Sequence, residues 1–121
     1  MSENITRHFQ SSGRTFVNLT EVVPGKWEKV CVFGPRSDNK AAKKLLGFDW
    51  DLESKTSIAS NDKIALLLFV KGQEVVEKVE HPRRDGDFAN LSRQCIAREK
   101  ASFNHETNPK KEWPGLFPKK G

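Results

Sequence analysis

The stretch from Lys63 to Phe88, KIALLLFVKGQEVVEKVEHPRRDGDF, decides the fold of this chain. Residues 64–70 are apolar at every position, which is typical of a central strand that is covered on both faces. A Lys-Gly pair at 71–72 is a turn signal, and residues 74–81 then alternate between apolar and polar side chains. The pattern predicts a β-hairpin at the centre of the domain.

The alternation in the second half of this hairpin predicts which side chains share a face. Val75 and Val79 are expected to point one way, and Lys78 and Glu80 the other.

Three further elements are predicted before the hairpin. Residues 15–23 alternate weakly and are rich in β-branched side chains, which favours a first strand. Residues 26–33 read as a strand, with Trp27, Cys31 and Phe33 on one face and the intervening valines on the other. Residues 37–46 read as an amphipathic helix that Ser37 caps and Gly47 ends.

The length of 121 residues corresponds to a single domain. We expect an α+β fold: an antiparallel sheet of four to five strands with one main helix (about 37–46) and a disordered basic C-terminal tail. In this interpretation residues 1–13 form a flexible arm, residues 14–104 form the α+β domain, and residues 105–121 form a Pro/Lys-rich tail.

The net charge of +5 raises the question of a nucleic-acid partner. Residues 107–121 carry four lysines against one glutamate, so they supply +3 of this charge and the rest of the chain only +2. A domain that grips phosphates usually concentrates basic side chains on one face. The distribution therefore argues against nucleic acid, and we expect another protein as the partner.

The two cysteines, Cys31 and Cys95, leave two alternatives open. They are either two buried thiols in a reducing compartment or one disulfide, which would stabilise the fold by about 4 kcal/mol in the chain-entropy model. They are too few for a four-cysteine zinc site, and the histidines show no ligand spacing. We expect no metal and no cofactor.

The best candidate site is a polar cluster at the end of the hairpin. It contains a histidine, two arginines and two aspartates: His81, Arg83, Arg84, Asp85 and Asp87. Such a cluster could bind an anionic group, since arginine suits carboxylate and phosphate, or it could act in acid–base chemistry. The structural alternative is a salt-bridged turn in which the aspartates pair with the arginines and cap the next turn.

Trp50 is the second candidate, because it lies among Asp49, Asp51 and Glu53. An exposed tryptophan with an acidic rim could anchor a protein interface. Alternatively, it covers the core beside the end of the helix.

The chain contains no nucleophile elbow, P-loop or dinucleotide-binding motif, so we expect no catalytic residues and no enzymatic activity. No apolar run approaches the length that spans a membrane, and residues 1–10 lack the apolar segment of a signal peptide.

Four segments together resemble a group of small uncharacterised bacterial proteins that are often exported or lipoprotein-like: residues 30–35, 45–50, 56–62 and 80–88. The resemblance covers about residues 27–98 and implies a bacterial source and export, but no mechanism. It leaves open a lipid anchor on the native form, with the lipidated cysteine replaced here by Met1. In an exported protein the Cys31–Cys95 disulfide becomes the favoured alternative.

These observations predict a small non-catalytic bacterial binding protein at the cell envelope, in the periplasm or attached to a membrane, that recognises a protein or an anionic partner. The alternative is a cytosolic immunity or inhibitor protein that neutralises a toxin or enzyme. A nucleic-acid-binding accessory protein is the third class. The oligomeric state is left open.

Overall fold

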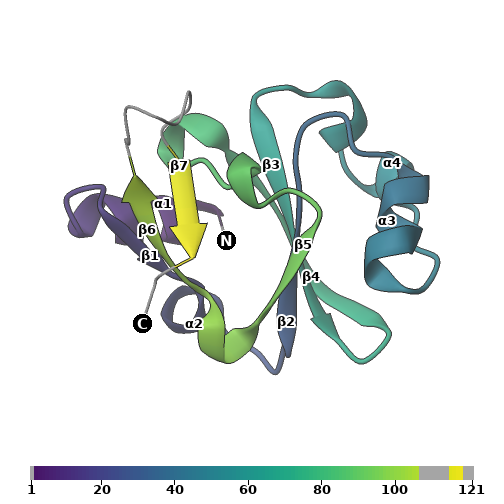
Figure 1. Ribbon diagram of the computed structural model, residues 1–121, viewed down its shortest axis with the longest axis horizontal. Helices are drawn as coiled ribbons and strands as arrows, with labels where there is room; N and C mark the ends of the chain where they lie inside the picture. Colours follow the sequence, from purple (N-terminus) through teal and green to yellow (C-terminus); the bar gives the residue numbers. More distant parts are fainter. Residues whose placement is uncertain (1, 107–114, 119–121) are drawn as a thin grey trace.

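The computed structural model describes residues 2–106 and 115–118 and contains two antiparallel sheets with a few short helices (Figure 1). The α+β prediction is confirmed. Most of the predicted tail, residues 107–114 and 119–121, lies outside the described residues.

The larger sheet has the strand order β4-β3-β2-β5. It is formed by β2 (Lys29–Phe33), β3 (Ile64–Lys71), β4 (Glu74–Pro82) and β5 (Gln94–Ala97). The predicted hairpin is β3–β4, and β3 is buried at every position from 64 to 70 because side chains pack against both of its faces.

A β-bulge in this hairpin changes the faces that the alternation predicts. Val75 pairs with Val70 and Glu77 pairs with Phe69, so Val76 is an extra residue and is 44% exposed. Val79 is buried with Phe69 on one face of the sheet, whereas Val75 packs on the opposite face. The prediction that Val75 and Val79 point the same way is therefore wrong, because the bulge inverts the alternation between them.

The two faces of the larger sheet belong to two separate apolar clusters. The first core lies between this sheet and the smaller sheet and includes Val30, Val32, Leu67 and Phe69. The second core covers the other face and includes Cys31, Phe33, Leu66 and Leu68. Trp27, which was expected beside Cys31 and Phe33, packs instead in the first core, edge-on to Phe69.

Helices cover the second core. They are α3 (Asn39–Leu46), α4 (Leu52–Lys55) and the 3₁₀ turn η1 (Ile58–Ser60). The predicted helix exists and ends at Gly47, which is in the left-handed conformation. Its cap is Asp38, whose carboxylate accepts from the Ala41 amide, and not Ser37, which is buried and donates to the Gly34 carbonyl.

The smaller sheet has the order β1-β6-β7 and joins segments from both ends of the chain. Its strands are β1 (Phe16–Asn18), β6 (Ser102–Glu106) and β7 (Gly115–Pro118), and a short helix, α2 (Leu19–Val22), follows β1. Residues 115–118 belong to the predicted tail, but they pair with β6. That part of the tail prediction is wrong, since the Gly115–Pro118 segment supplies Leu116 to the first core.

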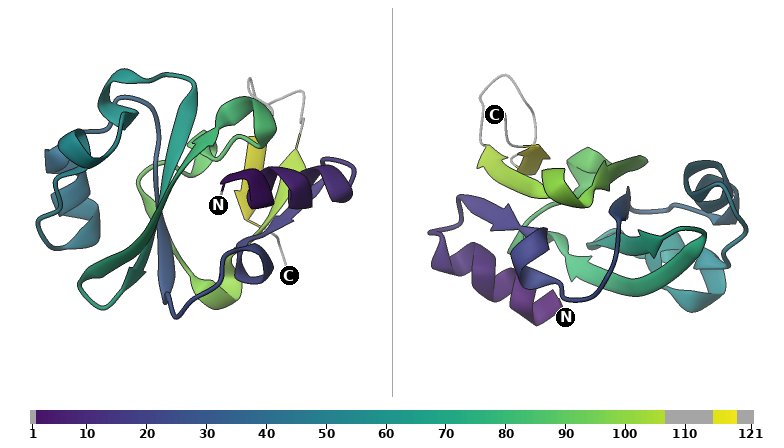
Figure 2. Two further views of the ribbon diagram at one scale, coloured as in Figure 1. Left: turned by 180° about the vertical axis from the view of Figure 1, so that it is seen from behind. Right: turned by 90° about the horizontal axis from the view of Figure 1, so that it is seen from below.

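The predicted flexible arm is also wrong. Residues Ser2–Ser11 form helix α1, and Ile5 and Phe9, one turn apart, are fully buried in the first core. Figure 2 shows α1 and the smaller sheet on one side of the larger sheet, with α3 and α4 on the other. Packing of these two side chains fixes the helix on the domain.

Cys31 and Cys95 face each other across β2 and β5 and form a disulfide with a Cα–Cα distance of 4.0 Å. The two residues are 64 positions apart in the sequence, so the bond fixes the edge strand β5 to the centre of the larger sheet. Of the two alternatives that the sequence left open, the structure contains the bridged one.

Candidate functional site

The polar cluster predicted from the sequence lies where β4 ends and the chain turns toward the smaller sheet. After Pro82 the chain forms a 3₁₀ turn, η2 (Arg83–Asp85), and then passes through Gly86, whose φ of 122° favours glycine. A second 3₁₀ turn, η3 (Ala89–Leu91), follows. Consecutive side chains in so tight a turn point in different directions, which separates the members of the cluster.

His81 lies beneath this turn and is fully buried. Its Nε2 lies 3.0 Å from the Asp85 carbonyl oxygen, its Nδ1 lies 2.7 Å from Ser2 Oγ, and its ring stands edge-on to Phe88. Burial lowers the pKa of His81, and the hydrogen bond and the charge of Asp85 offset this only in part. The imidazole is therefore neutral at pH 7 and does not face the surface.

Arg83 and Asp87 form an ion pair across the turn. Arg83 Nε lies 3.2 and 3.1 Å from the two carboxylate oxygens, and Nη2 lies 3.1 Å from Oδ2. Asp87 also accepts from the amide of Ala89, the first residue of η3, at 2.9 Å. This part of the cluster follows the structural alternative of a salt-bridged turn.

The turn forms one wall of an open pocket of about 810 Å³ at the junction of the two sheets. Arg83, Arg84, Gly86 and Asp87 line it from the turn and the residues after it. The remaining lining residues come from four other places: Arg14 from the loop before β1, Asp62, Lys63 and Ile64 from the turn before β3 and its first residue, Pro82 from the end of β4, and His105 from β6. We call this cavity the basic pocket.

The pocket carries an excess of positive charge, because four cationic side chains line it against two carboxylates. Both carboxylates are already engaged: Asp87 pairs with Arg83, and Asp62 forms two hydrogen bonds with Arg36, at 3.0 and 3.2 Å. The Arg36 guanidinium lowers the pKa of Asp62. Within the described part of the chain, Lys63 and Arg84 have no carboxylate partner within 4.0 Å.

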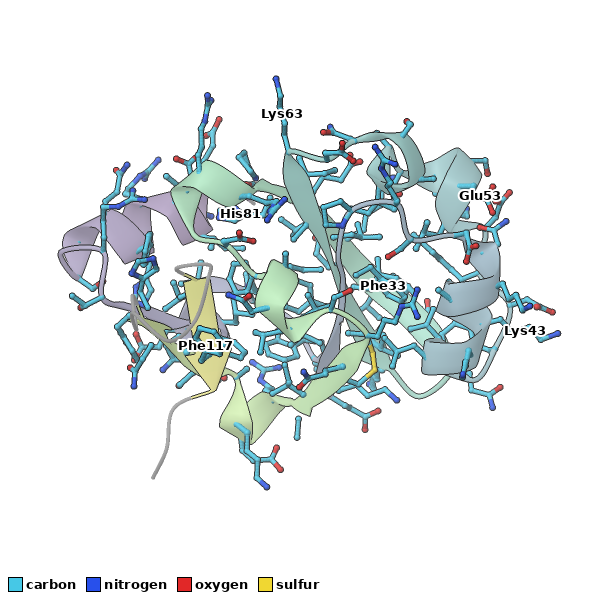
Figure 3. The ribbon with its side chains drawn as sticks, turned by 45° about the horizontal axis from the view of Figure 1, so that its top comes forward. Phe33, Lys43, Glu53, Lys63, His81 and Phe117 are labelled. Atoms are coloured by element: carbon cyan, nitrogen blue, oxygen red, sulfur yellow. A yellow bond between two sulfur atoms is a disulfide. The ribbon has the colours of Figure 1, made fainter. Side chains whose placement is uncertain are left out.

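Arg14 completes the basic lining and was not predicted from the sequence. Its guanidinium lies 4.9 Å from the centre of the Phe9 ring, and it donates to the Arg84 carbonyl at 2.9 Å. These contacts hold Arg14 against the turn that carries Arg84. Lys63, the residue before β3, projects away from the body of the protein (Figure 3).

Trp50 lies apart from this site. It is half-buried, packs against the second core, and borders a shallow depression of about 310 Å³ with Lys55, Val75 and Val76. The polar cluster belongs to the opposite face of the larger sheet, since His81 packs against Phe88 of the first core. The two candidate sites are therefore not brought together.

The structure thus divides the predicted cluster into three. Arg83, Arg84 and Asp87 line the basic pocket; Asp85 faces a smaller depression beside α1; and His81 is buried between them. Among the described residues, no group of three or more His, Cys, Asp or Glu side chains is arranged to hold a metal ion. No helix in that part of the chain is long and apolar enough to cross a membrane.

No family model matches the sequence, and comparison with curated proteins and with solved structures finds no match. The geometry of the site is consequently the basis for a functional proposal.

Proposed function

We propose that this protein is a small, non-catalytic bacterial binding protein that acts at the cell envelope and recognises an anionic group of its partner in the basic pocket. The observation that carries the proposal is the uncompensated charge in that pocket. Among the residues that the structure describes, Lys63 and Arg84 stand at its surface without carboxylate partners, while Asp62 and Asp87 are each held by an arginine. An incoming carboxylate or phosphate would supply the missing charge.

The framework of the pocket supports a binding role. Arg83 is held by Asp87 and by the Asp62 carbonyl, to which it donates at 3.0 Å, and Arg14 is held by the Phe9 ring and the Arg84 carbonyl. Side chains that are already ordered lose less conformational freedom when a ligand binds. The pocket is open and large enough for an acidic side chain together with its neighbouring residues.

The Cys31–Cys95 disulfide supports a location outside the cytoplasm. Disulfides persist in oxidising compartments and are rare where glutathione and thioredoxin keep thiols reduced. An acidic segment of another envelope protein is the partner that we favour, since charged side chains and the apolar residues Ile64 and Pro82 line the pocket together.

The test is a titration of the ¹⁵N-labelled full chain with a short glutamate-rich peptide, followed by NMR at low salt. We expect the amides of Lys63, Arg84 and Gly86 to shift, and the affinity to fall as sodium chloride is added. The double variant Lys63→Glu/Arg84→Glu should weaken binding at least tenfold, because it reverses both unpaired charges.

The matched control is Lys40→Glu/Lys44→Glu on α3, which changes the net charge equally at two exposed lysines on the far side of the larger sheet. It should retain the affinity of the unmodified protein. Equal losses in the two variants would show that the peptide responds to net charge alone, and the proposal for the pocket would then be wrong.

A further inference from the structure

Ser2 and His81 form a hydrogen-bonded pair that the basic pocket does not use. Ser2 begins α1 and His81 is the last but one residue of β4, yet Ser2 Oγ lies 2.7 Å from His81 Nδ1. The two residues are therefore brought together by the packing of α1 against the larger sheet.

The direction of this hydrogen bond follows from the other ring nitrogen. His81 Nε2 faces the Asp85 carbonyl oxygen at 3.0 Å, and a carbonyl can only accept, so Nε2 carries the proton. In the neutral imidazole Nδ1 is then the acceptor, and Ser2 must donate its hydroxyl proton to it. An activated nucleophile needs a hydroxyl, a base that can take its proton, and a group that orients the base. Ser2 Oγ, His81 Nδ1 and the Asp85 carbonyl have this arrangement.

The surroundings of His81 keep it in the form that can accept a proton. The ring is fully buried, stands edge-on to Phe88, and lies next to Gly86 in the turn. Asp85 is the charged group that acts on it. The base is consequently neutral and fixed in orientation before any ligand arrives.

Ser2, unlike His81, is only partly buried and reaches the surface. It lines a depression of about 350 Å³ together with Thr6, Arg7 and Gln10 of α1, with Pro82 at the end of β4 and with Asp85 of the turn. Glu3, in the first turn of α1, lines it too.

Other serines of α1 and the loop after it lack this arrangement. Ser11 Oγ donates to the Arg7 carbonyl at 2.9 Å, and Ser12 Oγ donates to the Phe9 carbonyl at 2.7 Å. A carbonyl oxygen is too weak a base to take the hydroxyl proton. Ser11 is therefore a control for Ser2 within the same helix.

We propose that Ser2 is an activated nucleophile and a site of covalent acylation, with His81 as its general base and activated carboxylic esters as the acyl donors. Ser2 Oγ attacks the ester carbonyl carbon while its proton passes to His81 Nδ1. The bond from that carbon to the leaving oxygen breaks, and the Nδ1 proton goes to the leaving group. The product is an acyl ester of Ser2 and neutral His81.

The proposal goes beyond the anion-binding function, because its residues lie on the other side of the η2 turn from Lys63 and Arg84. The experiment treats the full chain with p-nitrophenyl acetate, follows p-nitrophenolate release, and locates the acetyl group by mass spectrometry of peptides. We expect about one equivalent of hydroxylamine-sensitive acetyl on Ser2. Ser2→Ala should abolish it, and Ser11→Ala should leave it unchanged.

The role of His81 is tested by pH and by substitution. The acetylation rate should rise as His81 loses its proton and become constant above about pH 6.5, the ordinary histidine pKa. His81→Gln should slow the reaction by about 100-fold, as loss of a general base does. Should that variant fail to fold, the pH profile of the unmodified protein still tests the base.

Acetyl groups found only on amines, or unchanged p-nitrophenolate release in Ser2→Ala, would overturn the proposal. Either result would leave Ser2 as a side chain that only anchors α1. Charge reversal at Lys63 and Arg84 should not alter acetylation, so the two proposals succeed or fail separately.

Discussion

At the scale of single residues, burial decides what the ionisable side chains of the turn can do. His81 comes from a sequence segment rich in charge, but its ring is fully buried and satisfied by two hydrogen bonds. Arg84, three residues later, is exposed and unpaired within the described residues. The sequence places these residues together, and only the backbone of the turn separates their roles.

The buried His81 makes stability depend on pH. Its pKa is lowered in the folded state, so the unfolded chain, with a pKa of about 6.5, binds the proton more tightly. The contribution of neutral His81 to the free energy of unfolding is fully present above pH 6.5 and is lost as the pH falls below that value. We expect the free energy of unfolding to decrease between pH 7.5 and pH 5, with a slope of at most about 1.4 kcal/mol per pH unit from His81.

The measurement is urea unfolding at several pH values for the unmodified protein and for His81→Gln. The comparison uses slopes and not absolute stabilities, since the substitution itself costs stability. His8 and His105 are present in both proteins, so their contributions cancel. Identical pH slopes would show that His81 is not buried in solution as it is in the structure.

At the scale of elements, α1 shows why part of the fold was missed in the sequence. Only Ile5 and Phe9 of this helix are apolar and buried, and a ten-residue helix is marginal in water by itself. The segment therefore gives a weak helical signal and looks like a polar arm. Its order comes from the first core, where Phe9 packs near His105 of β6 and under Arg14.

Removing the Phe9 ring tests whether α1 is part of the folded domain. Phe9→Ala should lower the free energy of unfolding by about 3–5 kcal/mol, because it leaves a cavity in the first core. Gln10→Ala, at the exposed neighbouring position, should change it by less than about 0.5 kcal/mol. Urea unfolding measures both, and a small effect at Phe9 would support the mobile arm that the sequence suggested.

The central hairpin and α3 could be predicted because their signals are local. The apolar run of β3, the turn at 71–72 and Gly47 all act on their own neighbours. The faces of β4 could not be predicted in full, because the bulge at Val76 depends on the pairing with β3. Val76 has no paired residue on β3, and the alternation of apolar and polar residues along β4 does not reveal this.

At the scale of the whole molecule, the features that were missed join distant parts of the chain. Val17 pairs with Phe103 in the smaller sheet, and Arg14 meets Arg84 in the basic pocket. Neither pairing has a signal in the local sequence. The candidate site was accordingly predicted as one segment, residues 81–87, whereas the pocket draws its lining from five parts of the fold.

The disulfide is expected to contribute to the stability of the fold and to indicate whether the protein is located in an oxidising compartment. Closing a loop of this length stabilises the fold by about 4 kcal/mol in the chain-entropy model. We expect a loss of that size in the double variant Cys31→Ala/Cys95→Ala, measured by urea unfolding.

Native protein alkylated from lysis onward should show no free thiols. Two free thiols would argue for a cytosolic inhibitor or immunity protein instead of an envelope protein.

The Cys31–Cys95 bond also gives the covalent chain a topology: a closed ring with two free ends. All of β3 and β4, α3, α4 and the η2 turn lie inside the ring, whereas α1 and the whole smaller sheet belong to the ends. A single backbone cut inside the ring therefore leaves one covalent molecule, while a cut between α1 and β2 releases a piece. The basic pocket takes Lys63 and Arg84 from the ring and Arg14 and His105 from the two ends. The pocket is complete only while both ends remain docked on the ring.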